Sequence, residues 1–140
     1  MKHYFLDTNV VLDFLARREP FAEAALAIFR AGLEKRATLY VASLSFSNLY
    51  YTLRKQTDPK TARALMAHLQ SLVTVIAVDA DTISQAITGP FADFEDAIQH
   101  YAAAAVPLID AIITRDLRDF APSTLPVLTP TQALTHLATT

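Results

Sequence analysis

The chain has 140 residues, 52% of them hydrophobic and 19% charged, and carries a net charge of −2. This length and hydrophobic content suit a single domain over residues 1–140. The absence of cysteine excludes disulfide bonds and thiolate metal sites, and the small net charge excludes a general attraction to nucleic acid. Because no stretch approaches the ~18 apolar residues of a membrane span, we expect a soluble, cytoplasmic protein without a membrane partner.

Short apolar runs alternate with helical patterns along the chain. In chain order, the sequence predicts a strand at 3–6, helices at 10–16 and 21–33, a strand at 38–41, helices at 45–55 and 59–72, a strand at 73–78, helices at 80–88 and 94–105, strands at 109–114 and 125–128, and a helix at 130–136. Asp58 and Thr129 each precede a proline and are predicted to cap the helices that follow. Apolar strands separated by helices favour an α/β fold with a mainly parallel sheet covered on both faces.

Two of the predicted strands are followed by an aspartate. Asp7 comes directly after the first strand, and Asp116 follows the strand at 109–114. Ligands of open α/β sheets bind beyond the carboxyl ends of the strands, so these acids would converge if their strands are parallel neighbours. Like charges brought together call for a cation, and carboxylate oxygens suit Mg²⁺ or Mn²⁺. The alternative for Asp7 is that it only caps the helix that follows.

Further acids lie near the start of the helix at 94–105 and after Asp116. Asp93 and Asp96 are three residues apart and share one helix face, so we expect Asp96 to point toward the crevice and Glu95 to face away. Asp93 could also be only the N-cap of this helix. Asp119 lies one helical turn after Asp116 and is a further candidate for holding or supporting the cation.

Short polar side chains flank these acids. Thr8 and Asn9 follow Asp7 and could orient its carboxylate or hold a water molecule. Thr114 and Arg115 precede Asp116 and are placed to contact a substrate phosphate, although Arg115 could equally pair with one of the acids.

The charges are unevenly distributed along the sequence. Residues 17–63 contain nine basic and four acidic residues, whereas residues 93–119 contain six acidic and two basic residues. An acidic cation site beside a basic surface that follows phosphates would have this pattern, and so would helices with ordinary solvated faces.

Three motifs together resemble the PIN domain family, and specifically its VapC-type toxins of toxin–antitoxin pairs. They are Leu-Asp-Thr-Asn-Val at 6–10, Asp-Phe-Glu-Asp-Ala at 93–97 and Ile-Ile-Thr-Arg-Asp-Leu-Arg-Asp-Phe at 112–120. The resemblance spans residues 3–134. It implies a three-layer α/β/α fold with four to five strands and a Mg²⁺- or Mn²⁺-dependent endoribonuclease whose metal-binding and catalytic acids are Asp7, Asp96 and Asp116. It also implies an RNA substrate, a small antitoxin partner and a homodimer.

The chain departs from this family pattern at one position. Many PIN domains have a glutamate in the helix after the second strand, where this chain has Asn48. An amide oxygen carries no charge, so Asn48 would hold a second cation less firmly. One-metal chemistry, weaker activity and a noncatalytic RNA- or protein-binding module all stay open.

A phosphatase of the haloacid dehalogenase type is a further alternative, because it also begins with an aspartate after the first strand. That chemistry requires a second acid two residues later, where Asn9 stands, and a late lysine, whereas no lysine follows Lys60.

Overall fold

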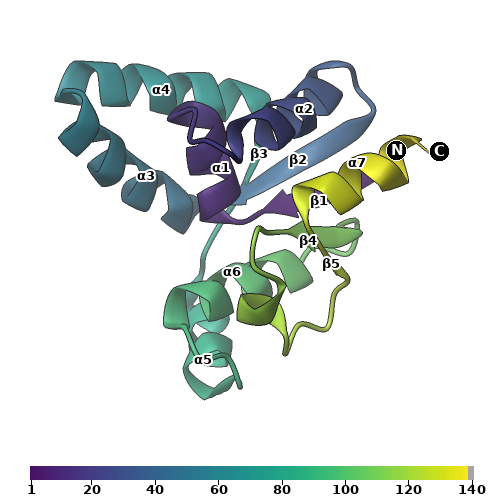
Figure 1. Ribbon diagram of the computed structural model, residues 1–140. Helices are drawn as coiled ribbons and strands as arrows, with labels where there is room; N and C mark the ends of the chain where they lie inside the picture. The colour runs from purple at the N-terminus through teal and green to yellow at the C-terminus, as the bar shows by residue number, and fades with distance from the viewer. Residues whose placement is uncertain (139–140) are drawn as a thin grey trace.

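The computed structural model describes residues 1–138 and places five parallel strands in one sheet (Figure 1). In chain order the elements are β1 (Lys2–Leu6), α1 (Thr8–Leu15), α2 (Ala22–Leu33), β2 (Ala37–Ala42), α3 (Ser43–Gln56), α4 (Pro59–Leu72), β3 (Thr74–Ile76), α5 (Ala80–Thr88), α6 (Phe94–Ala104), β4 (Ala111–Ile113), the 3₁₀ helix η1 (Leu117–Phe120), β5 (Val127–Leu128) and α7 (Pro130–Ala138). The strand order is β3-β2-β1-β4-β5. The predicted α/β fold with a parallel sheet of four to five strands is therefore confirmed.

The strands and helices differ from the predictions mainly at their ends. Strand β3 covers three residues instead of the predicted six, and β4 covers three instead of six. Strand β3 lies at the edge of the sheet and has only β2 as a neighbour, so the apolar residues at its ends have no second strand with which to form backbone hydrogen bonds. Helix α1 begins at Thr8, two residues earlier than predicted, because Asp7 has the extended backbone of an N-cap residue.

The two central strands bring distant parts of the sequence together. Strand β1 pairs with β4 in parallel, with Leu6 opposite Ile113. The pairing continues one residue further, since the Asp7 N–H donates to the Ile113 carbonyl oxygen at 2.9 Å. Asp7 and Thr114 therefore leave the same edge of the sheet side by side.

Alternate residues of each strand face opposite sides of the sheet, and both sides are buried. In β1, Tyr4 and Leu6 belong to one core cluster and Phe5 to the other. Helices α1, α2, α3, α4 and α7 cover the first face, whereas α6 and η1 contribute to the second (Figure 1). This is the three-layer arrangement that the resemblance implied.

Two predicted helix starts are confirmed by capping bonds. Asp58 accepts a hydrogen bond from the Thr61 N–H at 2.8 Å. Thr129 and Gln132 form a reciprocal capping box, with bonds of 3.2 and 2.9 Å. Within residues 1–138, every helix is too short or too polar to cross a lipid bilayer.

Candidate metal centre

Asp7 is held at the end of β1 and is almost fully buried, with 4% of the residue's surface exposed. Its side chain makes no capping bond to α1. Instead, Oδ1 accepts a hydrogen bond from Nε2 of Gln99 at 3.1 Å, and Oδ2 accepts one from Oγ1 of Thr114 at 2.9 Å. Burial raises the pKa of Asp7, and these two bonds offset only part of the rise. The carboxylate is thus oriented by neutral donors and has no cation among these partners.

Gln99 is a site residue that the sequence analysis missed. It lies on α6 with 1% of its surface exposed, and its Oε1 accepts the Thr8 N–H at 3.1 Å while its Nε2 binds Asp7. The two bonds fix which way the amide is turned. The one available signal was its position three residues after Asp96, on the same helix face.

The first turn of α6 adds three more carboxylates. Asp93 is the N-cap and accepts the Asp96 N–H at 2.9 Å, yet it also lines a hollow of about 250 Å³ that we call the acidic hollow. The walls of the acidic hollow are formed by Asp7, Thr8, Asn9, Asp93, Glu95, Asp96 and Asp119. Glu95 was expected to face away, and this expectation is wrong.

Asp96 is the group that responds most to this crowding. Burial, followed by the charges of Asp7, Asp93 and Asp119, raises the pKa of Asp96 from 3.8 to about 7. The pKa of Asp119 is also raised, by loss of solvation and then by its acidic neighbours. Since like charges raise an acid's pKa only when they are not compensated, the acidic hollow has an excess of negative charge.

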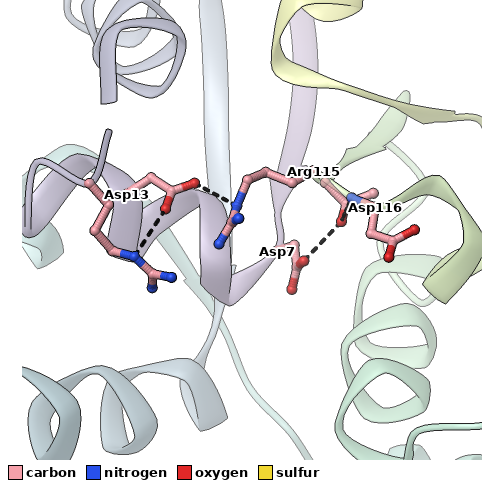
Figure 2. A network of polar contacts seen from close by, with 6 residues as sticks. Asp7, Asp13, Arg115 and Asp116 are labelled. Carbon is pink, nitrogen blue, oxygen red and sulfur yellow. Dashed lines mark hydrogen bonds and ion pairs between the residues drawn. The ribbon is translucent and has the colours of Figure 1, made fainter. Parts of the chain in front are cut away.

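Asp116 is close in sequence but turned elsewhere. It is exposed, it caps η1 by accepting the Arg118 N–H at 3.0 Å, and it is not part of the wall of the acidic hollow. In Figure 2 its carboxylate points away from Asp7. Its own N–H donates to Oγ1 of Thr114 at 3.2 Å, so its backbone is tied to the residue that binds Asp7.

Arg115 is engaged with a residue that was not a sequence candidate. Its Nε lies 2.8 Å from Oδ2 of Asp13, a carboxylate of α1 with 1% of its side chain exposed (Figure 2). Of the two pairings considered for Arg115, a phosphate or an acid, the structure has the pairing with an acid.

The family of the chain follows from a comparison with protein-family models, in which residues 3–118 match the PIN domain. The chain belongs to the PIN domain family. The resemblance to this family that the motifs indicated is thereby confirmed. None of the curated proteins matches the sequence.

Solved structures that are similar to this PIN domain include VapC-type toxins. A VapBC2 structure from Rickettsia felis bound to a promoter DNA fragment is 16% identical, with a TM-score of 0.68 over 90% of this chain and 96% of that chain. A toxin–antitoxin complex from Klebsiella pneumoniae is 21% identical, with a TM-score of 0.63 over 91% and 97%. VapC20 of Mycobacterium tuberculosis, a toxin that cleaves the sarcin–ricin loop, is 18% identical, with a TM-score of 0.61 over 78% and 86%. These chains share the fold.

Asn48, the departure from the PIN domain pattern, lies on α3 outside the wall of the acidic hollow. A different residue of α3 contacts the wall of the acidic hollow. Ser45 is fully buried, and its Oγ lies 2.6 Å from Oγ1 of Thr8. Helix α3 therefore supports the residue after Asp7 through a hydroxyl pair.

The acidic hollow suits a divalent cation in donor type and in charge. Its donors are carboxylates, and the charge that raises the pKa of Asp96 is the charge that such an ion neutralises. These carboxylates do not yet surround a single point. In the part of the chain that the structure describes, no three Asp, Glu or His side chains are arranged to hold one ion. Binding would therefore include an adjustment of side chains.

Proposed function

We propose that this PIN domain is a Mg²⁺- or Mn²⁺-dependent endoribonuclease. The observation that supports the proposal best is the raised pKa of Asp96, at about 7, in a hollow walled by further carboxylates. A hollow with uncompensated negative charge repels RNA unless a cation occupies it, and hard carboxylate oxygens select Mg²⁺ or Mn²⁺.

In this proposal Asp7, Asp96 and Asp116 hold the ion, with Asp93 and Asp119 as additional acids. The Asp116 side chain must turn from its outward orientation toward the acidic hollow to take part. Gln99 and Thr114 keep the Asp7 carboxylate in one orientation by their bonds of 3.1 and 2.9 Å. Thr8 and Asn9 stand at the wall where a water molecule or a phosphate oxygen would be positioned. Asn48 is a candidate for a more distant supporting role on α3.

The ion supplies charge neutralisation at the phosphate and a lowered pKa of the attacking water. Binding of the ion sets two requirements on the carboxylates. Asp96 must lose its proton to become a ligand, and Asp7 must be ionised in its buried position. Since water attacks in place of the ribose 2′-hydroxyl, we expect products with 5′-phosphate and 3′-hydroxyl ends.

The test is cleavage of a labelled single-stranded RNA with Mn²⁺, with Mg²⁺ and with EDTA. Asp7→Asn is the site variant, and Asp81→Asn is the matched control, because Asp81 is an exposed acid on α5 outside the acidic hollow. We expect metal-dependent cleavage that Asp7→Asn abolishes and Asp81→Asn retains. Products with 2′,3′-cyclic phosphate ends, or cleavage that persists in EDTA, would contradict the proposal.

We further propose that the protein is the toxin of a toxin–antitoxin pair and forms a homodimer. The support is its membership of the PIN domain family together with a fold shared with structures of VapBC complexes. Co-expression with the product of the adjacent gene, followed by co-purification and light scattering, tests both statements.

A noncatalytic RNA-binding module is the second candidate. It is favoured by the outward orientation of Asp116 and by the amide at position 48. RNA binding without cleavage at any concentration of Mn²⁺ would identify it. Hydrolysis of a chromogenic phosphate monoester would instead indicate a phosphatase.

A further inference from the structure

Asp13 is a buried charge that the proposed chemistry does not use. It lies on the inner face of α1 with 1% of its side chain exposed. Burial raises its pKa, and the charges of Arg115 and Arg18 lower it again. A carboxylate removed from water is costly unless it is paired, so its partners have to be explained together with it.

The two partners of Asp13 are not equivalent. Arg115 is the close one, with Nε 2.8 Å from Oδ2 and 23% of its side chain exposed, whereas Arg18 is 3.7 Å from Oδ1 and 40% exposed. The Arg115 guanidinium also lies over the ring of Phe21, 4.0 Å from its centre. An ion pair and a cation–π contact therefore hold the same guanidinium on the side of α1.

The backbone of Arg115 lies next to the candidate metal site. Its neighbours in sequence are Thr114, which binds Asp7, and Asp116, which is a proposed ligand. A guanidinium next to several uncompensated carboxylates would be attracted to them. Figure 2 shows that the Arg115 side chain instead extends to Asp13.

We propose that Asp13 is a positioning residue that keeps the Arg115 guanidinium out of the acidic hollow, so that the carboxylates stay free for a divalent cation. Asp13 acts through Arg115 and does not touch the ion. The inference rests on the proposed metal binding and adds a residue to it.

The experiment measures Mn²⁺ binding by calorimetry for the unaltered protein and for the variants Asp13→Asn, Arg115→Met and Asp13→Asn/Arg115→Met, with thermal unfolding measured in parallel. In Asp13→Asn the freed guanidinium competes with the ion, so we expect affinity to fall about tenfold. The double variant has no guanidinium to compete, so it should bind Mn²⁺ as tightly as Arg115→Met. Recovery of Mn²⁺ affinity without recovery of thermal stability distinguishes positioning from a structural role.

Two results would overturn the inference: an Asp13→Asn variant that binds Mn²⁺ like the unaltered protein, or a double variant that binds as weakly as Asp13→Asn. If Asp13→Asn does not fold, Asp13→Ser replaces it, because the smaller serine hydroxyl also leaves the Arg115 guanidinium without this charged partner. Unchanged Mn²⁺ affinity in Asp13→Ser would then overturn the inference. Failure of the unaltered protein to bind Mn²⁺ would instead refute the proposed function.

Discussion

The substitution Asp96→Asn should make the metal-free protein more stable. Burial and the carboxylates of Asp7, Asp93 and Asp119 raise the pKa of Asp96 to about 7. Ionisation of Asp96 therefore destabilises the folded protein. Asparagine keeps the size of the side chain and removes the charge. A substitution that stabilises the fold and damages metal binding would mark Asp96 as a residue kept for function.

The pH dependence follows from the direction of this pKa change. Between the unfolded value of 3.8 and the folded value of about 7, the folded protein binds more protons than the unfolded chain. The free energy of unfolding therefore falls as the pH rises through this range and is level above it. The full difference in pKa corresponds to an upper limit of ~4 kcal/mol. Because solvent screens a partly exposed carboxylate, we expect about 1–2 kcal/mol.

The assay is urea unfolding in EDTA from pH 5 to pH 8, followed by circular dichroism because the chain has no tryptophan. The advantage of Asp96→Asn over the unaltered protein should grow up to about pH 7 and then stay constant. Asp81→Asn, on the exposed surface of α5, should show no such growth. The reasoning is refuted if the advantage is the same at pH 5 and pH 8, or if Asp96→Asn is the less stable protein at pH 8.

Three further substitutions test the surroundings of the site. Gln99→Leu removes the donor to Oδ1 of Asp7, so stability should fall by about 1–3 kcal/mol in urea unfolding; a gain in stability would contradict this. Thr114→Val removes a hydrogen bond that lowers the pKa of Asp7, so Mn²⁺ binding, measured by calorimetry, should require a higher pH. Thr114→Ser keeps the hydroxyl and should bind Mn²⁺ at the same pH as the unaltered protein. A shift of binding to lower pH in Thr114→Val would contradict this prediction. Gly89→Ala brings a methyl group to 2.8 Å from Cε2 of Tyr101 and should cost about 1–3 kcal/mol in thermal unfolding without changing Mn²⁺ affinity; a higher melting temperature would disprove the clash.

The order of strands and helices was predictable because the strands are mainly apolar and some of the helices carry their own start signal. Asp58 and Thr129 are examples, since their caps depend on residues only three positions away. Strand length was not predictable from the same signal. The apolar stretch at 73–78 continues beyond Thr74–Ile76, but pairing at an edge ends where its single neighbour ends.

The candidate site was predictable in part. The position of Asp7 at a strand end and of Asp96 on a helix face follow from local periodicity, and the structure places both at the acidic hollow. Gln99 was missed because an amide within an apolar helix stripe gives a weak signal. Asp13 was missed because its partner, Arg115, comes from the far end of the sequence and is brought to it only by the pairing of β1 with β4.

The pairing of β1 with β4 also explains why neutral and charged groups are separated at this site. The strands deliver the Asp7 carboxylate and the Thr114 hydroxyl to adjacent positions, and α6 adds the amide of Gln99, so the deepest contacts are neutral hydrogen bonds. The extra negative charge comes from the first turn of α6 and from the segment after β4, nearer to solvent. The two neutral donors favour the ionised form of the buried Asp7 carboxylate, while burial still leaves its pKa raised. An arginine placed at that depth would neutralise the site permanently, whereas a dissociable metal ion would do so only when bound.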